Sequence, residues 1–266
     1  MPLPALNLFA ILPAFALVLF RVSGMVMTAP IFGSPVIPLR IRAALTFVLT
    51  LITFPLLGNQ LPRAMTLSDV VSGLVGEFMI GAAIGLALTM MLLAGEVAGT
   101  LIGQQAGLAL GEVSNPLQEH QASVLGQIYT TVLTLVFLIA GGHRAIIATV
   151  MDTFAIIPVL TMRDTESIVV LLTETLTAAF VAGIRIAGPA MIALFLAAIT
   201  LAVLSRAMPQ LNILTVGFTI KVILALGVAW LALSFCEGLF LQVVVDGLDT
   251  VRAAFQLPPA RIRISS

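Results

Sequence analysis

Hydrophobic positions in this chain form long continuous stretches, and polar residues are gathered in short intervals between them. A helix needs about 20 apolar residues to cross the hydrocarbon core of a bilayer. Some stretches are shorter, and the fifth nearly joins the sixth, so we expect roughly six hydrophobic spans, some of them broken, re-entrant or buried in protein. The apolar stretches are Ala5 to Met27, Ala43 to Leu57, Val70 to Leu93, Val124 to Ala140, Ile168 to Ile184, Ile186 to Leu204 and Ile213 to Phe235.

Prolines mark two of the expected boundaries. Three of them fall between Thr28 and Pro38, a density that breaks a helix and makes an extended connection. Between His143 and Ile157, apolar residues recur at three- and four-residue spacing, which predicts an amphipathic helix that ends before Pro158.

Composition strengthens the membrane interpretation. The chain is 60% hydrophobic and only 9% charged, whereas soluble domains carry about 25% charged residues. No polar interval is long enough to fold alone, so we expect a single all-α membrane domain, 1–266, with a mobile tail at 256–266. The first basic residue is Arg21, so we expect no cleavable secretory signal.

Glycines recur at four-residue spacing in two places. A four-residue step leaves successive side chains only about 40° apart around a helix, so each row forms a groove without side chains. Small residues at this spacing let helices pack through their backbones in apolar surroundings. We therefore predict that partner helices occupy these grooves. The groove glycines are Gly73, Gly81, Gly85, Gly95, Gly99, Gly103, Gly107 and Gly111.

Ionisable side chains inside the apolar stretches are candidates for functional residues. Glu77 falls on the same face as Gly73, Gly81 and Gly85, so it should point at a partner helix. Intramembrane charges often carry function, but they also form pairs that only fix helix register, and the sequence leaves both alternatives open. The candidate charges are Arg21, Glu77, Glu174, Arg185, Lys221 and Glu237.

The sequence offers no pattern typical of an enzyme or a cofactor site. The single cysteine, Cys236, and the two histidines, His120 and His143, do not form a metal-ligand spacing. No nucleophile elbow, zinc-protease motif or phosphate-binding loop occurs. Twelve basic and twelve acidic residues cancel, so no strong field favours nucleic acid. We expect no catalysis, metal or cofactor.

A polar insert interrupts the second glycine row at Gln104 and Gln105, and an Asn115-Pro116 turn follows. The segment is either an ordinary connection between two helices or a loop that projects into a conduit, because non-helical backbone at membrane depth is tolerated only inside protein or beside water.

Several motifs resemble the flagellar biosynthetic protein FliR family and its type III secretion counterparts. The resemblance extends from about residue 15 to 240, and its most specific part is Arg206-Ala-Met-Pro-Gln-Leu-Asn212. The other matching motifs are Arg21-Val-Ser-Gly24, Ala29-Pro30, Pro38 to Arg42, Glu77 to Gly85, Gly95 to Gly107, Asn115-Pro116 to His143, Asp152-Thr153-Phe154, Pro158, Gly217-Phe218 and Phe235-Cys236-Glu237.

This resemblance implies a structural subunit of the bacterial flagellar export gate, a channel for unfolded flagellar proteins. It implies kinked helical hairpins that resemble a fusion of the FliP and FliQ folds, assembly with FliP and FliQ beside FlhB and FlhA, and a place in the inner membrane at the flagellar basal body. A pore plug is implied at about Gln104 to Glu119, with Gln104, Gln105, Leu108, Leu110, Glu112, Asn115 and Pro116 as its residues.

One alternative uses the same charges differently. In an independent proton-coupled secondary transporter, Glu77, Glu174, Arg185 and Lys221 would form a relay across the membrane. Such transporters are built from internal repeats, and the sequence shows none beyond the glycine spacing. The sequence also leaves open whether the exported cargo is flagellar or virulence-related.

Overall fold

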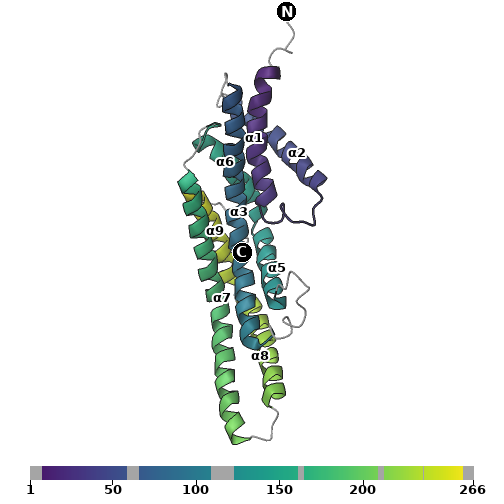
Figure 1. The fold of residues 1–266 in the computed structure, drawn as a ribbon, viewed down its shortest axis with the longest axis vertical. Coiled ribbons are helices and arrows are strands. Elements are labelled where there is room, and N and C mark those ends of the chain that lie inside the picture. The colour runs from purple at the N-terminus through teal and green to yellow at the C-terminus, as the bar shows by residue number, and fades with distance from the viewer. Residues whose placement is uncertain are drawn as a thin grey trace, which may run out of the picture. The chain divides into compact units, whose positions relative to one another are not determined.

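The computed structural model describes residues 8–58, 66–108, 123–160, 165–208, 213–235 and 237–259. Within these ranges every regular element is an α-helix, which confirms the predicted all-α class (Figure 1). The helices are α1 (Leu8–Thr28), α2 (Leu39–Leu57), α3 (Leu67–Ala106), α5 (Val124–Ile139), α6 (Gly142–Ile156), α7 (Thr165–Ala207), α8 (Ile213–Phe235) and α9 (Glu237–Ala254).

Four of the described helices, α1, α2, α3 and α7, are long and apolar enough to cross a membrane, and the bent pair α5 and α6 adds a fifth if it forms one span. The chain is therefore a polytopic membrane protein. The sequence predicted about six spans. The fifth and sixth of the seven apolar stretches join into α7, which has 43 residues and contains Pro189. Arg185, which separates those stretches, does not interrupt the helical backbone. The number falls below six because the described part of the seventh stretch, Val216–Trp230, is a shorter apolar helix.

The chain divides into two compact units, and each one uses segments that are distant in sequence. Unit 1 comprises Met1–Met91, Leu138–Leu176 and Val245–Ser266, and unit 2 comprises Leu92–Phe137 and Thr177–Val244. Helices α3, α5, α7 and α9 each contribute residues to both. The expectation of a single membrane domain, 1–266, rested on the short polar intervals of the sequence and stays a prediction.

In unit 1, α1 packs against α2 through the polar face of α2. Thr46, Thr50 and Thr53 are buried, and each hydroxyl donates a hydrogen bond to a carbonyl oxygen of the preceding turn. On the α1 side, the Phe15 ring meets the rings of Phe47 and Phe54 edge-on. The outer face of α2 is apolar, which is the reverse of a soluble helix and is typical of a helix in an apolar surrounding.

The predicted breaks at proline are confirmed in unit 1. Helix α1 ends at Thr28, and turns occupy the chain until α2 begins at Leu39. The Arg42 guanidinium fixes this connection, since it donates to the carbonyl oxygens of Ile37, at 3.1 Å, and Ser34, at 2.5 Å. Helix α6 ends at Ile156, two residues before Pro158, as the amphipathic pattern predicted.

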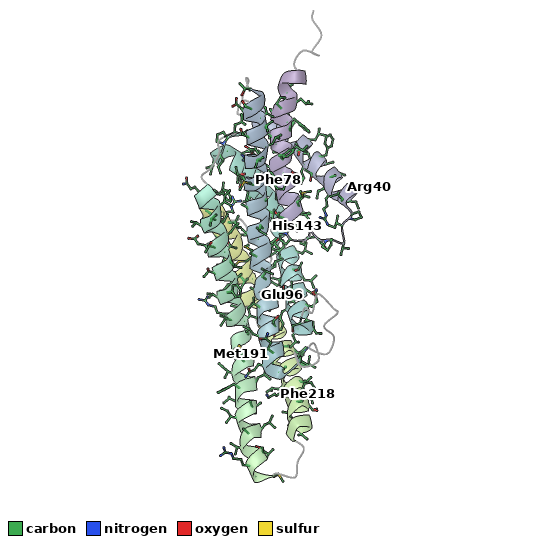
Figure 2. All side chains as sticks on the ribbon, in the orientation of Figure 1. Arg40, Phe78, Glu96, His143, Met191 and Phe218 are labelled. Carbon is green, nitrogen blue, oxygen red and sulfur yellow. The ribbon has the colours of Figure 1, made fainter. Side chains whose placement is uncertain are left out.

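In unit 2, α3 packs against both α5 and α7. A methyl group at Gly183 of α7 would lie 2.9 Å from Val97 Cβ and 3.0 Å from the Ala94 carbonyl oxygen, so the two helices are in close contact. The Tyr129 ring of α5 lies 6.3 Å from the Phe240 ring of α9. Exposed apolar side chains run along α7, where Ile192, Phe195, Leu196, Ile199 and Val203 are examples (Figure 2).

Helix α9 was not predicted, although the sequence carries a signal for it. Apolar residues recur at helical spacing after Glu237, and those that are buried are Phe240, Val243, Val244, Leu248 and Val251.

The end of α9 lies at the start of the tail, 256–266, that was expected to be mobile. Gln256 adopts a left-handed φ of 56°, and the backbone N–H groups of Gln256 and Leu257 donate to the carbonyl oxygens of Ala253 and Arg252. This is the pattern of a Schellman C-cap. Gln256 and Leu257 thus cap α9, residues 260–266 lie outside the described residues, and the mobility of the tail stays a prediction.

Candidate functional site

The first glycine row of α3 forms a backbone contact with α1. A methyl group at Gly81 would collide with the Arg21 carbonyl oxygen, and one at Gly85 would lie 2.7 Å from the Ala29 nitrogen. From the opposite side, a methyl group at Gly24 of α1 would collide with the Phe78 carbonyl oxygen of α3. The two backbones therefore touch, and no larger residue fits between them.

Two threonine hydroxyls add hydrogen bonds across this seam. Thr28 Oγ1 donates to the Ala82 carbonyl oxygen at 3.0 Å, and Thr89 Oγ1 donates to the Thr28 carbonyl oxygen at 2.6 Å. In apolar surroundings such bonds between helices add directly to small-residue packing. Gly73, one turn before Glu77, is covered by side chains of Leu17 and Leu160.

The second glycine row packs against α5. A methyl group at Gly95 would lie 2.9 Å from the Thr130 nitrogen, and one at Gly99 would collide with the backbone at Gly126. A methyl group at Gly103 would lie 2.8 Å from Ser123 Oγ. Because the partner positions on α5 fall in number as those on α3 rise, the two helices are antiparallel.

These contacts correct the predicted occupant of both grooves. The sequence analysis expected helices of partner subunits, but α1 and α5 of the same chain fill the faces of Gly81, Gly85, Gly95 and Gly99. Four-residue spacing shows that a backbone can approach, and it carries no information on which chain supplies that backbone. Gly107 lies past the end of α3 with a φ of 86°, close to Phe218, and Gly111 lies outside the described residues.

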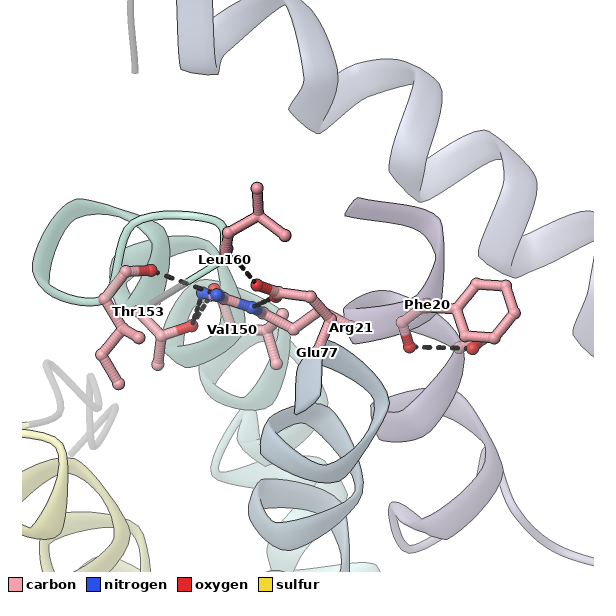
Figure 3. A network of polar contacts seen from close by, with 8 residues as sticks. Phe20, Arg21, Glu77, Val150, Thr153 and Leu160 are labelled. Atoms are coloured by element: carbon pink, nitrogen blue, oxygen red, sulfur yellow. Dashed lines mark hydrogen bonds and ion pairs between the residues drawn. The ribbon is translucent and has the colours of Figure 1, made fainter. Parts of the chain in front are cut away.

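The α1–α3 seam positions a buried ion pair. Arg21 is 0% exposed and Glu77 is 2% exposed, and Arg21 Nε donates to Glu77 Oε2 at 2.5 Å (Figure 3). Gly81 lies one helical turn after Glu77 and leaves α3 close enough to α1 for this short contact. A lone charge at this depth would be very unfavourable, so each residue requires the other.

The rest of the Arg21 guanidinium is directed at α6. Nη1 donates to Thr153 Oγ1 at 3.3 Å, and Nη2 donates to the Ile157 carbonyl oxygen at 3.1 Å. The guanidinium carbon lies 4.1 Å from the centre of the Phe154 ring, a cation–π geometry. Arg21 thus joins α1, α3 and α6.

The second oxygen of Glu77 fixes the turn that follows α6. The Leu160 backbone N–H donates to Glu77 Oε1 at 3.0 Å. Leu160 has a φ of 74°, a left-handed conformation that costs an ordinary residue roughly 1–2 kcal/mol. The carboxylate therefore stabilises an otherwise unfavourable backbone.

A second arginine holds α6 from α9. Arg252 Nη2 donates to Asp152 Oδ2 at 2.7 Å, and Nη1 donates to Thr149 Oγ1 at 3.1 Å. Its Nε donates to the Pro258 carbonyl oxygen at 2.5 Å. The Asp152 side chain is 46% exposed, so this pair is partly solvated, unlike that of Arg21. We call the two groups of contacts the Arg21 cluster and the Arg252 cluster.

Comparison with known proteins identifies the family. The model of the bacterial export proteins, family 1, matches residues 12–246. The chain belongs to this family. It is 26% identical to the flagellar biosynthetic protein FliR of Bacillus subtilis over 242 residues, which cover 90% of this chain and 91% of the relative. It is 29% identical to FliR of Escherichia coli over 230 residues, 85% of this chain and 87% of the relative.

A relative outside flagellar proteins also matches. The Yop proteins translocation protein T of Yersinia pestis is 27% identical over 184 residues, 68% of this chain and 70% of the relative. The matched span of the export-protein family includes every residue of the Arg21 cluster, whereas Arg252 lies beyond its last residue, 246.

The other predicted charges do not join these clusters. Glu174 and Arg185 are exposed on α7, and Lys221 is half-buried on α8. Within the described residues, none of the three forms an ion pair. The Glu237 side chain lies outside the described residues.

The predicted plug segment begins within α3. Gln104 and Gln105 belong to the last turn of α3, which continues to Ala106, and Leu108 lies in the turn that follows. The polar pair does not end the helix, because glutamine is a good helix former. The other plug residues, Leu110, Glu112, Asn115 and Pro116, lie outside the described residues.

The arrangement supports a structural role for the buried charges. Every polar atom of the Arg21 guanidinium described above faces an acceptor, and Glu77 uses both oxygens. No group of three or more potential metal-binding side chains occurs in the described part of the chain. The sequence analysis assigned no role to Thr153, Phe154 or Arg252, since their partners lie about a hundred residues away in the chain.

Proposed function

We propose that this protein is a non-enzymatic structural subunit of a flagellar type III export gate, the channel through which unfolded flagellar proteins cross the inner membrane. The observation that carries the proposal is the match to FliR relatives over most of the chain, up to 90% of its length. The match to a Yop translocation protein indicates the same class of export machinery.

The geometry agrees with a scaffold. Both glycine rows join helices through their backbones, and the Arg21 cluster connects three helices with no charged atom left for chemistry. Helices α2 and α7 expose long apolar faces. A subunit of this kind stabilises an assembly, while the energy for export comes from other components.

The proposed partners are FliP and FliQ, with FlhB and FlhA beside them, at the flagellar basal body. A pore plug at about Gln104 to Glu119, of which Gln104 and Gln105 lie in the last turn of α3, belongs to the same proposal. Both extend the resemblance to FliR to this chain.

Copurification tests the proposal. The chain, tagged at its C-terminus, is extracted in mild detergent from cells that express the complete set of flagellar export genes. We expect the FliP and FliQ proteins of the same cells to copurify with it, and its deletion to abolish secretion of hook and filament proteins. A chain that purifies alone, together with normal secretion after deletion, would refute the proposed function.

The transporter alternative receives no support from the described residues. Its relay requires Glu77 to exchange protons with Glu174, Arg185 and Lys221, but Glu77 is bound to Arg21 and to the Leu160 backbone. Reconstitution of the purified chain into proton-tight vesicles distinguishes the two functions. Proton-driven uptake of a small solute by the chain alone would favour the transporter.

A further inference from the structure

A row of polar side chains lies exposed on the α3–α5 pair of unit 2. On α3 it contains Glu96, Thr100 and Gln104, each one residue after a glycine that faces α5. A one-residue step turns a helix by 100°, which moves these side chains out of the glycine contact and onto an open face. Glu96, labelled in Figure 2, and Gln104 are exposed, and Thr100 is half-exposed.

Helix α5 continues the row on the same side. Gly126 of α5 lies opposite Glu96 and Thr100 of α3, since a methyl group at Gly126 would lie 3.2 Å from Thr100 Oγ1 and 3.3 Å from the Glu96 carbonyl oxygen. Gln127 and Thr131 follow Gly126 by one and five residues and are both exposed. Because α3 and α5 are antiparallel, a one-residue step from the contact leads to the same side of the helix pair on both helices. The polar side chains of α3 and α5 therefore lie on one side. We call Glu96, Thr100, Gln104, Gln127 and Thr131 the polar stripe.

Two unpartnered polar groups belong to this region. Glu96 forms no ion pair with any residue that the structure describes. Thr130 lies between Gln127 and Thr131 on the contact side, and its Oγ1 is buried without a hydrogen-bond partner. The Glu96 carboxylate is an acceptor, and the Thr130 hydroxyl can both donate and accept. Intramembrane charges in such positions face a water-filled cavity or another polar group.

The exposed face of α7 in unit 2 has the opposite character. The α7 face carries Ile192, Phe195, Ile199 and Val203, and Arg185 is the only charge within a long apolar run. A unit with one apolar face and one polar stripe has a preferred orientation in the membrane. Its apolar face fits acyl chains or apolar helices, and its polar stripe fits water or other polar groups.

We propose that the polar stripe lines the aqueous path through which unfolded polypeptide is exported. This inference rests on the proposed function and adds the face of the chain that meets the substrate. Amide, hydroxyl and carboxylate groups can exchange hydrogen bonds with any extended backbone. The stripe contains no aromatic or aliphatic anchor, so it would hold a passing chain weakly and with little regard to sequence.

Cysteine accessibility tests the inference in the assembled apparatus. Cys236 is the single native cysteine, so Cys236→Ser provides a background without thiols. Glu96→Cys, Thr100→Cys and Gln127→Cys probe the stripe, and Ile192→Cys and Phe195→Cys are matched controls at exposed apolar positions of the same unit. Membranes that contain all flagellar export proteins are treated with a charged, membrane-impermeant maleimide, with and without an export substrate stalled in the apparatus.

We expect the three stripe positions to react, the two α7 positions to stay unreacted, and the stripe to lose its labelling when substrate is stalled. Stripe positions that never react and instead crosslink to a partner subunit would show a helix-packing face and overturn the inference. Labelling that a stalled substrate does not reduce would show water access outside the export path, and would overturn it as well.

Copurification of the partner proteins from the same membranes separates this inference from the proposed function. If FliP and FliQ copurify and the stripe is inaccessible, only the assignment of the stripe fails. If no partner copurifies, the proposed function itself fails.

Discussion

The two halves of α3 contain the same kinds of residue, but the glutamate has a different role in each half. Each half has a row of glycines in contact with a neighbouring helix, and each has one glutamate close to those glycines in sequence. Glu77 lies four residues before Gly81, on the glycine face, and is buried against Arg21. Glu96 lies one residue after Gly95, off the glycine face, and is exposed.

This difference of register decides the role of each carboxylate. A glutamate on the same helix face as the glycines lies in the helix contact, where its buried charge requires a cation and backbone donors as partners. A glutamate displaced by one residue, or 100°, leaves the contact and keeps its charge available to water. The same residue type in the same helix is therefore structural in one half and a surface group in the other.

The largest expected effect comes from widening the first glycine contact. Gly81→Leu places a side chain where the Arg21 carbonyl oxygen lies, and neither backbone can move without separating α1 from α3. We expect a loss of at least about 3 kcal/mol, more than usual for overpacking because the Arg21 cluster is disrupted too. The measurement is an unfolding titration of the purified protein in mixed micelles.

Gly188→Ala is the matched control for that variant. Gly188 lies within α7 and has open space around it, so alanine there should be neutral or slightly stabilising. Gly81→Leu protein that is as stable as the control would show that the α1–α3 contact does not hold the fold. Gly99→Leu, which meets the α5 backbone, should behave like Gly81→Leu. Any loss of partner binding in that variant would follow from the damaged fold.

Much of this comparison could be predicted from the sequence. Four-residue spacing placed Glu77 with Gly73, Gly81 and Gly85 and predicted that it points at a partner helix; in the structure it contacts Arg21 of α1 in the same chain. The identity of that helix could not be predicted, because spacing describes one surface and not its complement. The prediction of partner subunits in the grooves failed for this reason.

The second prediction contrasts the two glutamates directly. Glu77→Gln keeps the shape of the side chain but leaves Arg21 as a buried charge without its partner, which costs about 3–5 kcal/mol. Glu96→Gln changes an exposed group and should alter stability by no more than about 0.5 kcal/mol. Both values come from the same unfolding titration. Equal destabilisation by the two variants would show that register relative to the glycines does not determine the role of the carboxylate.

The contacts of Arg21 with α6 were beyond sequence reasoning for a different reason. One of its acceptors is the backbone carbonyl of Ile157. Every residue has such a carbonyl, so the residue type does not indicate which one accepts a hydrogen bond. The Asp152-Thr153-Phe154 motif supported the resemblance to FliR, yet adjacent residues of a helix point in different directions. Thr153 and Phe154 contact Arg21, while Asp152 contacts Arg252. The motif joins α6 to two arginines at once, and only the fold shows this.

The smallest expected effect comes from the partly solvated pair. Asp152→Asn removes the charge opposite Arg252, but Arg252 keeps its bonds to Thr149 Oγ1 and the Pro258 carbonyl oxygen. The Asp152 side chain is 46% exposed, so water already screens the pair, and such pairs contribute about 0–1 kcal/mol. Asp152→Asn should therefore be several-fold less destabilising than Glu77→Gln in the same titration. A loss as large as that of Glu77→Gln would mean that α6 depends on both arginines equally, and that burial does not separate the two clusters.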